Sequence, residues 1–246
     1  MAEELRSSRK DTKLIEQQRK LRCENLSFAA KEAYKRLRTN VQFCFTGEES
    51  CRVIGVTSPQ PSEGKSMTAI NLAYSMAQTE KKVLLIDADM RRSSIGGKLE
   101  MEGGAGLSNL LTTVGSINGV LRRYTPSDGT PGFDVITGGA VPPNPSELLS
   151  SERMASLTGK LREAYEFIII DLPPVGAVAD AQTVARLTDG MLIVMRENHC
   201  TQSILNDCLG QLKLANAKVL GFVLNGSVAG SSKTYSYSKY ASNYYK

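Results

Sequence analysis

Short apolar runs without polar alternation recur along the chain, and stretches with helical spacing separate them. We predict a strand at each run: RVIGVTS (52–58), KVLLIDAD (82–89), FDVITGG (133–139), FIIIDLPP (167–174), GMLIVM (190–195) and KVLGFVLN (218–225). Strands of continuous Val, Ile and Leu are typically covered on both faces of a parallel sheet. Because such strands alternate with helices here, we predict an α/β fold with a mostly parallel central sheet and helices on both faces.

The stretches between these runs predict the helices. Residues 27–45 carry apolar side chains at helical spacing, and Ser27 is the expected N-cap. Further helices are expected at 65–78, 147–166, 179–188 and 201–215. Ser146 is the expected N-cap of the helix at 147–166, and residues 96–131 are expected to form short helices and loops.

Composition divides the chain into three parts. Residues 1–26 are highly charged with mixed signs and predict an N-terminal arm, residues 27–226 form the folded domain, and residues 227–246 form a flexible tail. The cysteines form no C-x-x-C pair and are expected to be reduced thiols; they are Cys23, Cys44, Cys51, Cys200 and Cys208. No segment approaches the roughly 18 apolar residues of a membrane-spanning helix, so we expect a cytoplasmic location.

The segment from Ser58 to Ser66 lies between the first strand and a helix, which is where phosphate-binding loops lie. Backbone N–H groups of the turn and the helix N-terminus would bind phosphates, with Lys65 contacting the β- and γ-phosphates of ATP. The pattern is incomplete, because Pro59 stands at the usual first glycine and no glycine precedes Glu63. The expected nucleotide-binding residues are Ser62, Glu63, Gly64, Lys65, Ser66, Met67 and Arg91.

Three aspartates stand at the ends of two predicted strands. Asp171 follows three isoleucines, as in a Walker B motif, and Asp87 and Asp89 follow the run VLLI. A single aspartate at such a strand-to-loop turn is common. Three of them beside a Gly-Lys-Ser loop predict a site for a nucleotide and a magnesium ion.

Each of these side chains has an expected role. The expected Mg²⁺ ligands are Ser66, Asp87 and Asp171. Lys65 and the metal would neutralise charge on a transferred phosphoryl group. Asp87 or Asp89 would accept or orient the proton of an incoming hydroxyl. Arg91 would either stabilise phosphates or lie in a solvated loop.

The end of the chain is rich in tyrosine. Five of the nine tyrosines lie within residues 235–246, namely Tyr235, Tyr237, Tyr240, Tyr244 and Tyr245. Residues 208–246 also contain five lysines, no arginine and no acidic residue, which accounts for the net charge of +5. Each phosphate adds roughly −1.5 to −2 charges, so two or three phosphotyrosines would make this segment acidic. Because this segment has no arginine and the chain has no basic stripe, nucleic-acid binding is not expected. The tyrosine-rich tail is instead typical of a substrate that the domain itself modifies.

Several of these motifs together resemble the bacterial tyrosine kinases of capsular and exopolysaccharide synthesis. They are LLIDADMRR, IIIDLPP, GAVPPNPSELL (139–149) and the tyrosine tail. The resemblance covers roughly residues 27–246 and is strongest to the stand-alone cytoplasmic subunit of Gram-positive type. It implies a P-loop kinase that uses ATP and Mg²⁺ and autophosphorylates the tail tyrosines between neighbouring subunits.

The resemblance also implies partners. Members of that family carry Glu-x-x-Arg-x-x-Arg at the subunit contact of a ring, and this chain has Glu32, Lys35 and Arg38 at these positions. Lysine cannot make the bidentate contacts of arginine, so weaker ring assembly is expected. A simple pair between Glu32 and Arg36 within the helix is the alternative. The other implied partners are a transmembrane adaptor, which recruits the kinase to the inner face of the membrane, and a cognate tyrosine phosphatase.

Two alternatives remain open. One is a P-loop ATPase switch related to the septum- and chromosome-positioning ATPases, which typically place a second lysine early in the loop. No lysine lies between Thr57 and Gly64, which favours the kinase. The other is a scaffold in which nucleotide only gates partner binding and a separate kinase modifies the tail. The complete set of Lys65, Ser66 and three aspartates argues against this scaffold.

Overall fold

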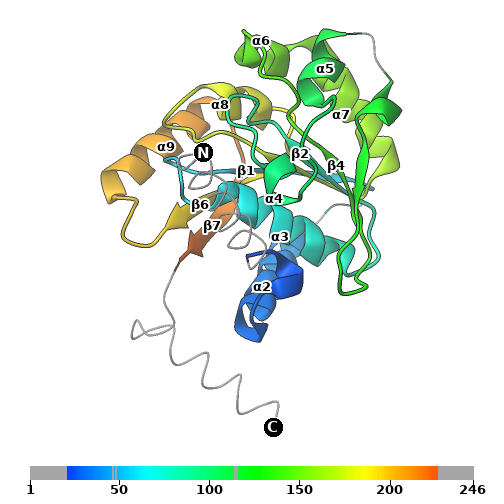
Figure 1. The fold of residues 1–246 in the computed structure, drawn as a ribbon. Coiled ribbons are helices and arrows are strands. Elements are labelled where there is room, and N and C mark those ends of the chain that lie inside the picture. Colours follow the sequence, from blue (N-terminus) through cyan, green and yellow to red (C-terminus); the bar gives the residue numbers. More distant parts are fainter. Residues whose placement is uncertain (1–20, 46, 48, 114–115, 227–246) are drawn as a thin grey trace, which may run out of the picture.

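The computed structural model describes residues 21–45, 47, 49–113 and 116–226. A seven-stranded sheet in the order β3-β4-β2-β5-β1-β6-β7 forms its centre (Figure 1). The strands are β1 (Arg52–Thr57), β2 (Val83–Asp87), β3 (Arg122–Tyr124), β4 (Phe133–Ile136), β5 (Phe167–Asp171), β6 (Gly190–Arg196) and β7 (Val219–Asn225). Every neighbouring pair is parallel except β3 and β4. The predicted α/β fold of P-loop type, with a mostly parallel sheet, is confirmed.

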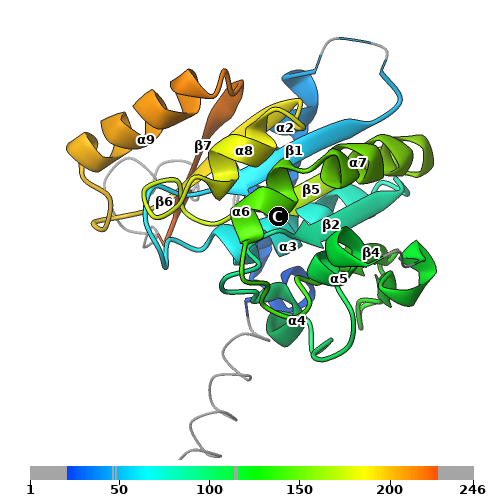
Figure 2. The ribbon, with the colours of Figure 1, turned by 90° about the horizontal axis from the view of Figure 1, so that it is seen from above.

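Helices cover both faces of this sheet (Figures 1 and 2). The helices are α2 (Phe28–Phe43), α3 (Lys65–Ala77), α4 (Ile95–Lys98), α5 (Leu107–Thr112), α6 (Pro145–Ser150), α7 (Glu152–Ala164), α8 (Asp180–Ala185) and α9 (Gln202–Leu214), with 3-10 turns η1 (Cys23–Asn25) and η2 (Ile117–Gly119). Helices α2 and α3 pack on one face, and α7, α8 and α9 pack on the other.

Alternate residues of the central strands build the two halves of the core. Leu84 and Val53 pair with Ile168 and face the helices α7, α8 and α9. Leu85 and Ile54, the next residues of the same strands, face the opposite side and pack with residues of α3. All of these side chains are fully buried. Burial on both faces explains why the strands read as continuous apolar runs. Because these strands are parallel, their carboxyl ends lie at one edge of the sheet.

The structure corrects four expectations about the elements. Strand β7 is an edge strand and is not covered on both faces, since Phe222 and Leu224 are about half exposed. Strand β3 was not expected, and the single helix predicted at 147–166 is two helices that meet at Ser151. Ser146 lies inside α6 rather than at its N-cap, because Asn144 is the cap residue and Pro145 opens the helix.

The N-terminal boundary shows both agreement and an additional contact. Ser27 is the N-cap of α2 and accepts a hydrogen bond from the backbone of Ala30, as predicted. Before it, Arg22 donates to the hydroxyl of Tyr124 at 3.2 Å, so residues 21–25 contact the domain. The arm up to residue 20, the tail 227–246 and its five tyrosines lie outside the described residues. Among the described helices, none has the length and apolar character that crossing a membrane requires.

Candidate functional site

The phosphate loop connects β1 to α3 at the carboxyl edge of the sheet. Ser62 and Gly64 both adopt positive φ angles, of 65° and 95°, which turns the loop into the helix at Lys65. The loop is also tied internally, because the backbone N–H of Gln60 donates to the Glu63 carboxylate at 3.0 Å. Ser62 adopts the left-handed conformation that a glycine usually adopts, because this loop has no glycine before Gly64. The backbone N–H groups at the start of the 13-residue helix α3 form an anion-binding end.

Lys65 lies between two of the predicted aspartates. Its Nζ is 2.9 Å from Asp89 Oδ2 and 3.4 Å from Asp171 Oδ1, and it is 3.4 Å from the hydroxyl of Ser66. Burial acts to lower the pKa of Lys65, but the Asp171 and Asp89 carboxylates outweigh it and raise the pKa. Lys65 is therefore a buried cation that two carboxylates neutralise, and nucleotide phosphates would take over that role.

The two aspartates of β2 and its loop differ in their surroundings. Asp87 is fully buried, and its Oδ2 accepts hydrogen bonds from the Ser93 hydroxyl and from the backbone of Ser94 and Ile95 at 2.8–3.0 Å. Burial raises the pKa of Asp87, although these donors oppose the shift. Among the described residues, the Asp89 carboxylate accepts from Lys65 and from the backbone of Arg92 alone. Asp87 thus shapes the loop, and Asp89 is the aspartate with more free acceptor capacity.

Asp171 lies directly beside Asp87 in the parallel pairing of β5 with β2. Burial raises the pKa of Asp171 to about 6, against the opposing effect of Lys65 and of a hydrogen bond from Ser66. Carboxylate and hydroxyl oxygens are the donors that Mg²⁺ prefers, usually together with substrate phosphates. Within the described ranges, no group of three or more His, Cys, Asp or Glu side chains is arranged to hold a metal alone. The carboxylates of Asp171 and Asp87 and the hydroxyl of Ser66 are oxygen donors of the kind that fits a magnesium ion shared with phosphate oxygens.

Arg91 makes contacts that the sequence did not suggest. Its Nε lies 3.0 Å and its Nη2 3.4 Å from the carboxylate of Asp180, and Nη2 also donates to the Ser146 hydroxyl at 2.9 Å. The hydrogen bond with Asp180 raises the pKa of Arg91, and the charge of Asp89 adds to the effect. Arg91 is therefore held by Asp180 and Ser146 rather than lying in a free solvated loop, and its predicted contact with nucleotide phosphates stays a prediction.

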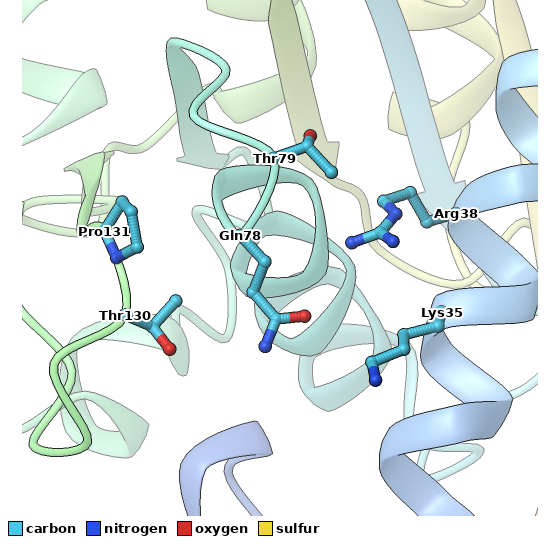
Figure 3. A pocket seen from close by; sticks show the side chains of 6 residues that line it. All are labelled: Lys35, Arg38, Gln78, Thr79, Thr130 and Pro131. Carbon is cyan, nitrogen blue, oxygen red and sulfur yellow. The ribbon is translucent and has the colours of Figure 1, made fainter.

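The predicted subunit-contact residues lie away from this site. Lys35 and Arg38 project from α2 into a pocket of about 340 Å³ that Gln78, Thr79, Thr130 and Pro131 also line (Figure 3). This pocket is at the end of α3, about 20 Å along the helix from Lys65. Lys35 pairs with Glu32 at 2.7 Å, instead of the expected alternative of Glu32 with Arg36.

Two neighbours of the phosphate loop were missed. Asn225, the last residue of β7, donates from Nδ2 to the backbone oxygen of Glu63 at 2.9 Å. His199 Nδ1 lies 3.6 Å from Glu63 Oε1, a buried atom that has no hydrogen-bond partner among the residues that the structure describes. A polar residue at the carboxyl end of an apolar run was a signal for Asn225, as it was for Asp171. Nothing in the sequence distinguished His199.

Comparison with known proteins identifies the family. Residues 51–219 match the AAA domain family. The chain is 36% identical over 206 residues to tyrosine-protein kinase YwqD of Bacillus subtilis, which covers 84% of this chain and 85% of that protein. The chain belongs to the bacterial tyrosine-protein kinase family. The kinase is also 36% identical to etk of Escherichia coli, over 88% of this chain and 29% of that longer protein.

Solved structures agree with this assignment. The kinase domain of Escherichia coli ETK superposes with a TM-score of 0.76 at 35% identity, over 82% of the kinase and 77% of that chain. The chimerical protein CapA2B2 superposes with a TM-score of 0.72 at 33% identity, over 78% of the kinase and 83% of that chain. The P-loop fold that they share implies nucleotide binding at the loop that opens α3.

Proposed function

We propose that the kinase transfers the γ-phosphoryl group of ATP to tyrosines of its own C-terminal cluster: Tyr235, Tyr237, Tyr240, Tyr244 and Tyr245. The observation that carries this proposal is the position of Lys65 between Asp89 and Asp171 at the start of α3. A phosphate-binding lysine and two carboxylates at one edge of the sheet are the groups that phosphoryl transfer requires.

The residues divide the chemistry between them. When bound, Mg²⁺ supplies charge neutralisation on the phosphates, and Ser66, Asp171 and Asp87 would hold it. Lys65 stabilises negative charge on the transferred group. The tyrosine oxygen forms a bond to the γ-phosphorus as the bond to ADP breaks. The phenolic proton moves to Asp89, because free tyrosine has a pKa near 10 and needs a nearby acceptor.

The role in the cell follows from the same family. We infer that the kinase regulates capsular or extracellular polysaccharide synthesis from the cytoplasm, where a transmembrane adaptor recruits it to the membrane and a cognate phosphatase reverses its action. A ring of identical subunits, joined through Glu32, Lys35 and Arg38, would bring each tail to a neighbouring active site. The exposed position of Lys35 on α2, with half its side chain in solvent, supports this contact.

Incubation of the full chain with Mg-ATP tests the reaction. Mass spectrometry should find phosphotyrosine within residues 235–245, and the Lys65→Met variant should show none. Addition of the cytoplasmic peptide of an adaptor should increase the yield. Hydrolysis of ATP without phosphotyrosine would instead support the ATPase switch.

A mixture of two variants tests transfer between subunits. The Lys65→Met chain keeps its tail but lacks the phosphate-binding lysine, and a chain ending at residue 226 keeps the lysine but lacks the tail. We expect phosphate on the tail of the Lys65→Met chain when both are present. An unmodified tail in the mixture, with normal activity of the parent chain, would rule out transfer in trans.

A further inference from the structure

Arg91, Ser146 and Asp180 form a closed triangle of hydrogen bonds beside the carboxylate site. Arg91 donates to both partners, and the Ser146 hydroxyl donates to Asp180 Oδ1 at 2.5 Å. Asp180 is fully buried, whereas about 40% of the Arg91 side chain is exposed. These three residues are hereafter called the Asp180 triangle.

The triangle joins loops from three adjacent strands. Arg91 follows β2, Ser146 lies in α6 after β4, and Asp180 begins α8 after β5. These strands are neighbours in the order β4-β2-β5, so the triangle crosses the carboxyl edge of the sheet next to β1 and the phosphate loop. Helices α6 and α8, which supply two of its members, also contact each other.

The triangle lies close in sequence to the groups that carry the chemistry. Arg91 is two residues from Asp89, and Asp180 ends the loop that begins after Asp171. The Asp89 carboxylate itself has few anchors, because in the part of the chain that the structure describes it accepts hydrogen bonds from Lys65 and the backbone of Arg92 alone. A bidentate arginine–carboxylate pair has a fixed geometry, so the position of Arg91 restricts where Asp89 lies relative to Asp171.

Stability alone gives a poor account of this arrangement. A buried carboxylate needs full compensation of its charge, and replacing a buried ion pair with apolar residues is often neutral or stabilising. Here the charge is buried at the edge of the active site, and its partner is a half-exposed residue of the same loop as Asp89. The arrangement fits a role in fixing loop positions for the reaction.

We propose that Asp180 is a positioning residue for phosphoryl transfer, acting through Arg91 and Ser146. The Asp180 triangle holds the loop of Asp89 at a fixed distance from Asp171, so that the acceptor hydroxyl, the proton acceptor and the γ-phosphate are aligned. This inference rests on the proposed tyrosine kinase reaction. Loss of alignment by about 1 Å costs on the order of 100-fold in rate, and it lets water compete with tyrosine for the phosphoryl group.

Two variants test the proposal. Asp180→Asn removes the charge but keeps one acceptor oxygen, and Ser146→Ala removes one hydrogen bond without leaving a charge unpaired. Each is assayed with Mg-ATP and a peptide of residues 227–246 for kcat, for the KM of ATP, and for the ratio of free phosphate to phosphotyrosine. Asp189→Asn is a matched control, because Asp189 also holds an arginine in a bidentate pair, Arg162 at 2.9 Å, before β6.

The expected result is a fall in kcat of about 10- to 100-fold for Asp180→Asn and about 3- to 10-fold for Ser146→Ala. The KM of ATP should change less than threefold, and free phosphate per phosphotyrosine should rise in both variants. The control should keep the parent ratio. An unchanged ratio in folded Ser146→Ala, or a loss that the control shares, would overturn the proposal. Failure of the parent chain to form phosphotyrosine would instead refute the kinase reaction itself.

Discussion

Asn225 Nδ2 lies 2.9 Å from the backbone oxygen of Glu63 and donates a hydrogen bond to it across 162 residues of sequence. This contact ties the end of the edge strand β7 to the phosphate loop. A Cβ added to Gly64 would lie 1.9 Å from the same Nδ2 atom, so the two segments are in close contact at that point. The last strand therefore supports the loop that binds nucleotide, although its own outer face is partly exposed.

Substitution of Gly64 should remove nucleotide binding. Gly64→Ala places a side chain at φ 95°, where only glycine is unstrained, and against Asn225. We expect at least 100-fold weaker binding of a fluorescent ATP analogue, and about 3- to 10-fold weaker binding for Asn225→Ala. Gly210→Ala in α9 is the control, since its Cβ meets nothing within 4 Å. Equal affinities of Gly64→Ala and the parent chain would contradict the role of the loop.

Substitutions of Asp87 and Asp89 should have different effects on stability and on catalysis. Asp87→Asn weakens three hydrogen bonds that order residues 93–95, so we expect a loss of about 1–3 kcal/mol in the free energy of unfolding. Asp89→Asn leaves these three hydrogen bonds in place but removes one of the two carboxylates that neutralise Lys65, and it should lower kcat by about 100- to 10,000-fold. Denaturant unfolding and phosphotyrosine formation measure the two effects. Full kinase activity in Asp89→Asn would exclude it as the proton acceptor.

The central part of the fold could be predicted because its physical signals are local. Continuous apolar runs identified β1, β2, β4, β5, β6 and β7. The Gly-Lys-Ser loop located Lys65, and the aspartates that follow two of the runs located Asp89 and Asp171 at the same edge. Strand β3 gave no such signal, because it has three residues and two of them are arginine. Composition likewise could not show that β7 lies at an edge, since its apolar run resembles those of central strands.

The contacts of Arg91 and Ser146 could not be predicted for a different reason. Ser146 precedes Glu147 and follows proline, a pattern typical of an N-cap, yet the helix begins at Pro145, two residues before the predicted start at Glu147. Its hydroxyl instead contacts Asp180, 34 residues later. Such pairs depend on which strands are adjacent in the sheet, and strand order is not encoded in any local pattern.

Stability should depend on pH through Asp171. Burial raises its pKa to about 6 from an ordinary value of 3.8, so the folded state binds more protons than the unfolded chain between these values. The contribution of Asp171 to folding is therefore most favourable below about pH 4 and is lost as the pH rises to about 6. Relative to the parent, Asp171→Asn should gain up to about 3 kcal/mol in the free energy of unfolding over this range, because the pKa of about 6 already includes the attraction to Lys65. The free energies of unfolding of both proteins are measured at pH 4.5 and pH 7. The same difference between the two proteins at both pH values would contradict this prediction.

Thiol labelling should separate the cysteines by burial. Cys51 and Cys208 are buried, and burial raises the pKa of each to about 11, whereas Cys44 and Cys200 are partly exposed. Because the thiolate is the reactive form, a disulfide reagent at pH 8 should label Cys44 and Cys200 at least 10-fold faster. In denaturant all sites should react at similar rates. The number of rapidly labelled thiols should be the same in Cys51→Ser, in Cys208→Ser and in the parent chain. A lower number in either variant would show that the buried thiol is labelled rapidly as well.

Assembly should respond to a change at Lys35. Its Nζ pairs with Glu32 at 2.7 Å, and its side chain is about half exposed at the pocket that Arg38 shares. Arginine at this position can keep that pair and still present a planar donor group to a neighbouring subunit. We therefore expect Lys35→Arg to shift the sedimentation profile towards larger oligomers at equal concentration, and Lys35→Glu to shift it towards the monomer. Lys160→Arg, on the exposed face of α7, should leave the profile unchanged. If all three variants sediment like the parent, this face of α2 is not a subunit contact.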